Sequence, residues 1–284
     1  MAGQLVAGEC EVGAHRLASR PVERIWGRRD LPRAFAPPAG AGAEPIGEIW
    51  FEGDADAELL VKYLFTSERL SIQVHPDDAA ARARGHKRGK DEAWYVLSAE
   101  PGAVIGLGLT QVVTREALRA AALDGSIERL LDWRPVAAGD VFYSPAGTVH
   151  AIGGGLSLIE IQQNLDLTFR LYDYGRPRAL HLDEAVAVAD PAPWTRPFAP
   201  VRDGPRTILA AGRAFVLERW SLSGDAEADL PEGCVLIPLA RGGAIDGAPL
   251  EAGTVWSGEG PCSLAGPADL LLAYPGPSAL PALL

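Results

Sequence analysis

The stretch that decides the fold runs from residue 70 to residue 95 and reads LSIQVHPDDAAARARGHKRGKDEAWY. Its first six residues alternate in polarity, and side chains alternate between the two faces of a strand. The stretch therefore predicts a strand with an apolar face and a polar face, made respectively of Leu70, Ile72 and Val74 and of Ser71, Gln73 and His75. A row of hydroxyl, amide and imidazole groups is typical of the lining of a polar cavity.

A second predicted strand adds a carboxylate to this polar row. After a proline and a short helical segment capped by aspartates, Lys90 and Glu92 fall on one face of the next strand. The amide of Gln73, the imidazole of His75 and the carboxylate of Glu92 would make three quarters of a site for a divalent metal. Lys90 and Ser71 each lie two positions before one of these residues, Glu92 and Gln73, and would serve as ligands for an anion beside the metal site.

The fourth ligand is suggested by residues 139–150, which read GDVFYSPAGTVH. The spacing of Gly139, Pro145, Gly147 and His150 predicts a turn, a strand, a sharp corner and a histidine on the returning strand. A β-barrel delivers an imidazole to its mouth in this way. The spacing resembles the second sequence motif of the cupin superfamily, whose members are small jelly-roll barrels that carry a metal inside.

Composition excludes several classes of function. The chain has 284 residues, 48% hydrophobic and 22% charged, which is typical of a globular protein with an ample core. A net charge of −11 argues against nucleic acid as a partner. No membrane span is expected, because no run of about 18 apolar residues occurs. No signal peptide is expected, because the N-terminus lacks the basic-then-apolar pattern. Three widely spaced cysteines predict neither a zinc-binding cysteine cluster nor disulfides, so we expect a cytoplasmic protein.

Several motifs together resemble one family, type I mannose-6-phosphate isomerase in its short bacterial form. The matching text is SIQVHPDD (71–78), GKDEAWY (89–95), PAGTVHA (145–151), EIQQNLDLTFRLYDY (160–174) and the Arg-x-Leu-His run of 178–181. The resemblance covers roughly residues 20–185, with these motifs in the family's order.

The resemblance implies a mostly β fold of two cupin barrels of the jelly-roll type. The helical pattern that begins at Thr114 predicts a small helical excursion near residues 114–132. Residues 1–195 would form the catalytic barrel, and residues 196–284 a degenerate barrel without a metal. A weak repeat supports the second barrel, since residues 249–257 echo 135–144 and no histidine follows His181. In this second half we expect strands over 212–220, 234–239 and 250–257.

The resemblance also implies an aldose–ketose isomerase that interconverts mannose 6-phosphate and fructose 6-phosphate through an enediol, with one Zn²⁺ per chain. By that resemblance the zinc ligands would be Gln73, His75, Glu92 and His150, the residues near the sugar phosphate Ser71 and Lys90, and the catalytic arginine Arg170. Alternation along residues 167–172 also points Arg170 inward, since its charge would be costly on the apolar face. The general base stays open among Glu160, Asp166 and a metal-bound water.

Two other classes of function fit the sequence less well. A non-catalytic sugar-binding or regulatory cupin would keep the barrel without turnover, but it would have little reason to keep ligands and cations together. A metal-dependent dioxygenase needs a redox metal, which the Gln/His/Glu/His set fits poorly. The sequence leaves open the oligomeric state, the range of hexose phosphates and the metal bound in cells.

Overall fold

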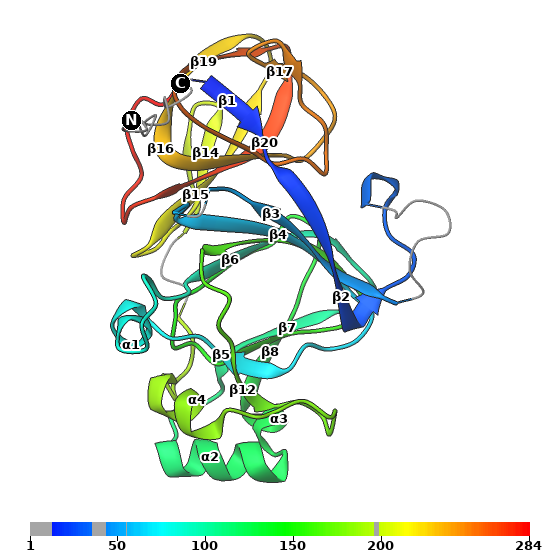
Figure 1. Cartoon of the computed structure of the whole chain (residues 1–284), viewed down its shortest axis with the longest axis vertical. Helices are drawn as coiled ribbons and strands as arrows, with labels where there is room; N and C mark the ends of the chain where they lie inside the picture. The colour runs from blue at the N-terminus through cyan, green and yellow to red at the C-terminus, as the bar shows by residue number, and fades with distance from the viewer. Residues whose placement is uncertain (1–12, 36–43, 55, 196–198) are drawn as a thin grey trace, which may run out of the picture.

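The computed structural model describes residues 13–35, 44–54, 56–195 and 199–284. In this part of the chain the strands form three antiparallel sheets that follow one another as layers, and helices cover the outer face of the last layer (Figure 1). Among the described residues, no helix has the length and the apolar character that a membrane crossing requires.

The middle layer is a sheet that is covered on both faces. Its strands, in spatial order, are β2 (Ala18–Arg28), β3 (Ile46–Glu52), β4 (Leu59–Thr66), β11 (Leu156–Gln163), β6 (Glu92–Ala99) and β9 (Val141–Ser144). Tyr63 and Ile161 belong to the face that packs against the C-terminal part of the chain. The opposite face carries Leu64 and Trp94, which pack against the next sheet. This burial on both sides accounts for the nearly continuous apolar run of β4.

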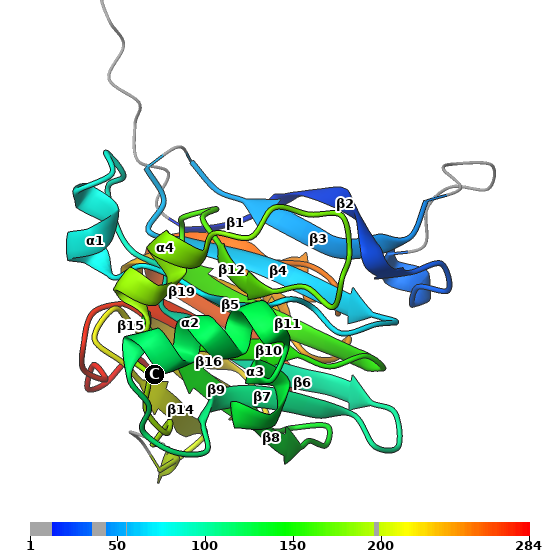
Figure 2. The same ribbon diagram turned by 90° about the horizontal axis from the view of Figure 1, so that it is seen from below.

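The second sheet carries the helices on its outer face. Its strands, in spatial order, are β12 (Phe169–Tyr172), β5 (Ile72–Val74), β10 (His150–Ile152), β7 (Val104–Leu109) and β8 (Leu131–Pro135). The helices that cover it are α2 (Arg115–Asp124), α3 (Ile127–Leu130) and α4 (Leu182–Val188) (Figure 2). Thr114 caps α2 by accepting a hydrogen bond from the amide of Ala117 at 3.1 Å, and Gly125 ends it with a φ of +79°. The helices α2 and α3 thus form the helical excursion that the sequence predicts near residues 114–132, and strand β8 begins directly after α3.

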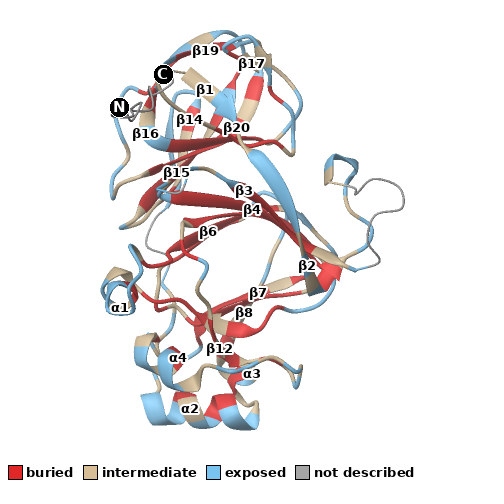
Figure 3. Cartoon of the chain, in the orientation of Figure 1, coloured by how far each residue is buried: buried red, intermediate tan, exposed pale blue. Residues whose placement is uncertain are grey.

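The third sheet contains the C-terminal strands. They are, in spatial order, β13 (Val201–Asp203), β14 (Arg206–Ala211), β15 (Phe215–Leu222), β20 (Ala268–Pro275), β16 (Ala226–Pro238), β19 (Trp256–Ala265), β17 (Ala244–Ile245) and β18 (Ala248–Pro249). β1 (Gly13–Arg16) also pairs with β19, which ties the start of the described chain to its end. Buried residues run through this sheet and the two below it (Figure 3). The boundary at 195/196 stays a prediction, and residues 196–198 lie outside the described part.

One expected strand is wrong. Residues 250–257 were expected to be extended, but β18 ends at Pro249 and β19 begins only at Trp256. The segment between them turns, because the amide and the hydroxyl of Thr254 both donate to the carbonyl of Glu251, at 3.2 and 2.7 Å. Gly253 has a φ of +85°, which the glycine adopts without strain.

The C-terminal sheet contains a buried ion pair that we expect to be important for stability. The carboxylate of Glu218 is fully buried and accepts hydrogen bonds from Arg206 at 2.9 and 2.7 Å, from Trp220 at 2.8 Å and from Tyr274 at 2.6 Å. Burial alone would raise the pKa of Glu218, but the hydrogen bonds from these three donors outweigh it and lower the pKa. The carboxylate therefore stays charged in the folded chain.

We expect Glu218→Gln to lower the free energy of unfolding at pH 7 by about 3–5 kcal/mol, because it leaves the buried Arg206 without a counter-charge. Since the pKa of Glu218 is lowered on folding, its contribution is present above the unfolded pKa of about 4.3 and is lost as the pH falls. The gap between wild type and variant should therefore narrow below about pH 4. Urea unfolding at several pH values, monitored by tryptophan fluorescence, measures the free energy of unfolding of both proteins. A difference between them that does not change with pH would contradict the prediction.

Candidate metal centre and active site

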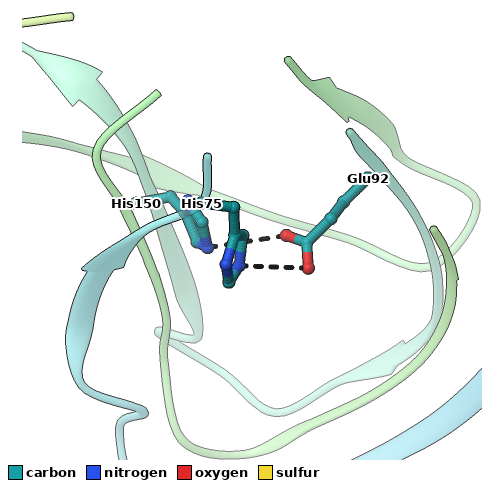
Figure 4. A group of neighbouring side chains, drawn as sticks. All are labelled: His75, Glu92 and His150. Atoms are coloured by element: carbon teal, nitrogen blue, oxygen red, sulfur yellow. Dashed lines mark ion pairs between the residues drawn. The ribbon is translucent and has the colours of Figure 1, made fainter. Parts of the chain in front are cut away.

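Two imidazoles from one sheet meet a carboxylate from the sheet opposite. His75 follows β5 and His150 begins β10 in the second sheet, whereas Glu92 begins β6 in the middle sheet. The Nε2 atom of His75 lies 3.2 Å from Oε1 of Glu92, and the Nε2 atom of His150 lies 3.5 Å from Oε2 (Figure 4). All three side chains are buried. The cluster therefore joins the two sheets of the N-terminal half.

Backbone carbonyls fix which nitrogen of each imidazole faces the carboxylate. Nδ1 of His75 lies 2.9 Å from the carbonyl oxygen of Leu167, and Nδ1 of His150 lies 2.9 Å from that of Thr148. A carbonyl only accepts, so each Nδ1 carries the proton and each Nε2 presents a lone pair. Burial, with the charge of Lys90, lowers the pKa of His75 to about 4, and burial also lowers that of His150. Both rings are therefore neutral at pH 7.

This arrangement fits a metal ion. Both carboxylate oxygens of Glu92 are buried without a hydrogen-bond partner, although the ammonium of Lys90 lies 2.8 Å from Oε1. Two imidazole lone pairs that face a carboxylate repel it unless cations lie near, and the Lys90 ammonium, which also lies 3.4 Å from Nε2 of His75, supplies one such charge. The ligand atoms of the three residues lie within 4.8 Å of one another, and two imidazoles with a carboxylate are a common donor set for zinc. The cluster could therefore hold a metal ion.

Gln73 lies in a row with two other residues that the sequence singles out. Its Cα is paired with that of His150 on β10 and with that of Arg170 on β12, and residues paired in this way lie on the same face of a sheet. The Nε2 atom of its amide lies 3.3 Å from Nε2 of His150, while Oε1 accepts a hydrogen bond from the hydroxyl of Ser71 at 3.0 Å. A half-turn of the amide would point the oxygen at the imidazole cluster instead.

A cavity of about 530 Å³ opens beside the cluster. Of the residues that the sequence predicts for the site, Ser71, Gln73, Lys90 and Arg170 line it. The three buried ligands lie behind this wall, in contact with Gln73 and Lys90. Arg170 is half-buried, its Nε has no hydrogen-bond partner, and burial lowers its pKa, with the nearby charge of Arg178 adding to the effect.

Sequence reasoning missed a buried lysine on the cavity wall. Lys62 projects from β4 and lies 3.5 Å from a carboxylate oxygen of Glu160, which the sequence offers only as one of several carboxylates. The ammonium of Lys62 also lies 4.2 Å from the ring centre of Trp50. The signal was present, because Lys62 is a lone charge within LLVKYLFT, an otherwise apolar strand. A charge in such a strand must face a polar interior.

The remaining wall residues add charge of both signs. Arg24 on β2 pairs with Glu48 at 2.8 Å, and Arg178 and His181 come from the segment after β12. Nδ1 of His181 accepts a hydrogen bond from the backbone amide of Arg170 at 3.2 Å. His181 thus lines the cavity and does not belong to the cluster of three ligands.

The chain is similar to known sugar-phosphate isomerases, although no family model matches it. The mannose-6-phosphate isomerase of Streptococcus mutans is 37% identical over 193 residues, which cover 65% of this chain and 61% of that protein. The mannose-6-phosphate isomerase ManA of Bacillus subtilis is 37% identical over 217 residues, covering 69% of this chain and 68% of that protein. The match thus spans less than two thirds of the Streptococcus protein and slightly more than two thirds of ManA.

Solved structures show the same fold. The mannose 6-phosphate isomerase from Bacillus subtilis superposes with a TM-score of 0.79 at 26% identity, covering 92% of this chain and 99% of that chain. A variant of the phosphomannose isomerase from Salmonella typhimurium gives a TM-score of 0.74 at 14% identity, covering 93% and 100%, which is a likeness of fold alone. The predicted mostly β, cupin-type fold is therefore confirmed. ManA is 37% identical to this chain, and the match covers 68% of ManA. The chain therefore belongs to the mannose-6-phosphate isomerase family.

Proposed function

We propose that the chain is a zinc-dependent aldose–ketose isomerase that interconverts mannose 6-phosphate and fructose 6-phosphate, with one zinc ion per chain. The observation that carries the proposal is the pair of neutral imidazoles that face the carboxylate of Glu92, all three buried directly behind a cavity lined by cationic side chains. The names of the Streptococcus mutans and Bacillus subtilis relatives support the substrate.

His75, Glu92 and His150 would hold the zinc, with the amide oxygen of Gln73 as the fourth donor. When bound, zinc supplies a Lewis acid that polarises the substrate's oxygen atoms. With the amide turned so that its oxygen faces the metal, the amide nitrogen would take the place of the oxygen beside Ser71 and would donate to its hydroxyl, which would hold the amide in that orientation. The set has one amide and one carboxylate beside two imidazoles, which makes redox chemistry with oxygen the poorer alternative.

The cationic side chains of the wall would bind the anionic substrate. Burial lowers the pKa of Lys90, but the negative charges of Glu92 and Glu160 outweigh burial and raise this pKa above its usual value. Lys90 is therefore an ammonium at pH 7. We place the phosphate near Ser71 and Lys90, and Arg170 beside the reacting carbons. There the guanidinium of Arg170 would stabilise the negative charge that develops on oxygen as the enediol forms.

Isomerisation moves one proton from C2 to C1 and another from the C2 hydroxyl to the C1 oxygen, and we assign the transfer between the carbons to the pair of Lys62 and Glu160. Both line the cavity, and their charged atoms are 3.5 Å apart. Burial lowers the pKa of Lys62, with Lys90 adding to the effect, and burial raises the pKa of Glu160, with Glu92 adding to it. Both shifts run toward neutral pH, where a group both takes and returns a proton readily. Asp166, also on the wall, remains the alternative base.

The test is an isomerase assay on mannose 6-phosphate, with production of fructose 6-phosphate coupled to a hydride-transfer readout. We expect removal of the metal by a chelator to leave less than about 1% of the activity, and stoichiometric zinc to restore it. If a zinc-loaded chain binds the sugar phosphate without turning it over, the alternative is correct and the protein is a non-catalytic sugar-binding or regulatory cupin.

A further inference from the structure

A buried carboxylate lies next to Glu92 and contacts the corner that precedes His150, but it does not line the cavity. Asp91 is fully buried and stands in the chain between Lys90 and Glu92. Its side chain accepts hydrogen bonds from the hydroxyl of Tyr143 at 2.8 Å and from the backbone amide of Ala146 at 2.9 Å. Its own amide and carbonyl are both bonded to Gln163, at 3.0 Å each. Asp91 is thus held from several directions at once.

The counter-charge of Asp91 comes from the C-terminal sheet. Arg213 lies in the turn between β14 and β15, and its Nη2 lies 2.9 Å from Oδ1 of Asp91. Its Nε lies 3.2 and 3.3 Å from the two carboxylate oxygens. Bidentate pairing of this kind fixes direction as well as distance. A Cβ atom added at Gly212 would lie 1.8 Å from the ring of Tyr143, so this turn is pressed directly against the second donor to Asp91.

The contacts of Asp91 lead to all three buried ligands. Glu92 is the next residue, and Ala146 belongs to the corner that precedes His150. The amide of Gly147 in this corner donates to the carbonyl of His75 at 2.9 Å. Nδ1 of His150 donates to the carbonyl of Thr148 in the same corner. A displacement of Asp91 would therefore move the donors of the whole cluster.

From this geometry we infer that Arg213 is a positioning residue of the metal centre: through Asp91, the C-terminal sheet sets the spacing between Glu92 and the two imidazoles. The inference rests on the proposed metal site. The remaining donors to the Asp91 side chain, the hydroxyl of Tyr143 and the amide of Ala146, are uncharged. Without the guanidinium, the buried carboxylate would lack a balancing charge and would move toward water. Such a movement would shift Glu92, and the corner that contains Ala146, relative to the two imidazoles.

The experiment measures the affinity of the purified apoprotein for Zn²⁺ by competition with a chromogenic chelator. Residues that orient metal ligands typically contribute about 10- to 100-fold to affinity, and we expect a loss of this size in Arg213→Met. Arg213→Lys, which restores one charge without the bidentate fork, should recover part of it. At saturating zinc, kcat should fall while KM for mannose 6-phosphate changes less than about twofold, since Arg213 does not line the cavity.

Arg219→Met is the matched control. Arg219 is a partly exposed arginine of the same sheet, bonded to Asp269 at 2.8 and 2.7 Å and absent from the cavity wall, so zinc affinity should be unchanged. Tyr143→Phe removes only the hydroxyl donor to Asp91 and provides a second test if Arg213→Met does not fold. It should weaken zinc binding as well.

Equal zinc affinity in wild type, Arg213→Met and Tyr143→Phe would overturn the inference and leave the isomerase proposal intact. The converse outcome is a wild type that binds zinc without isomerase activity, together with weakened binding in Arg213→Met. It would refute the isomerase proposal and support the positioning role. A wild type that binds no zinc would overturn both.

Discussion

Replacing Glu92 by glutamine should abolish isomerase activity by removing the metal. The substitution keeps the shape of the side chain but exchanges the one anionic donor for a neutral amide. We expect zinc affinity to fall more than about 100-fold, because even residues that only orient a ligand contribute about 10- to 100-fold. Activity at submicromolar zinc should fall in proportion to occupancy. Chelator competition and the isomerase assay, run on the same preparations, measure both quantities.

Glu48→Gln is the control for this substitution. Glu48 is also buried in the middle sheet and lines the cavity, but it pairs with Arg24 and with the indole of Trp50, outside the ligand cluster. Its substitution should leave zinc affinity within about threefold of wild type. The metal-centre assignment is wrong if Glu92→Gln retains full zinc affinity, or if both substitutions weaken binding equally.

Local patterns predict which of the proposed site residues share a face where they lie close together in sequence. Strict alternation placed Ser71, Gln73 and His75 on one face, and the corner before His150 required a proline and a glycine at fixed spacing. The convergence of β5, β6 and β10 could not come from alternation, which says nothing about which strands are neighbours. The resemblance to a family supplied that information.

Contacts between distant segments account for what the sequence did not predict. Lys62 faces Glu160 because β4 pairs with β11 in a register that only the folded sheet defines. Arg213 reaches Asp91 across 122 positions and between two sheets, and in the sequence it is simply a charge in a glycine-flanked turn. The strand expected at 250–257 failed because a side-chain hydrogen bond from Thr254 competes with the extended backbone.

The second large effect is expected at Arg170, whose substitution should slow catalysis and leave metal binding intact. Arg170 lies on the same face as Gln73 and lines the cavity, and its Nε has no partner in the described chain. A donor that acts mainly on charge developing in the transition state contributes about 10²- to 10³-fold to kcat. We therefore expect Arg170→Met to lower kcat by this factor, with zinc affinity within about threefold of wild type.

Arg134→Met separates this effect from the general loss of an arginine. Arg134 lies in the same sheet as Arg170 and also has a buried Nε without a hydrogen-bond partner. Its guanidinium stacks over Trp194, 4.9 Å from the centre of the ring, and Arg134 does not line the cavity. Its substitution should leave kcat and KM unchanged. A variant of Arg170 that raised KM at constant kcat would have lost binding that is equal in the ground state and the transition state, which would make this residue a binder of the phosphate. That outcome would exclude Arg170 from the chemical step and leave charge stabilisation to the metal and Lys90.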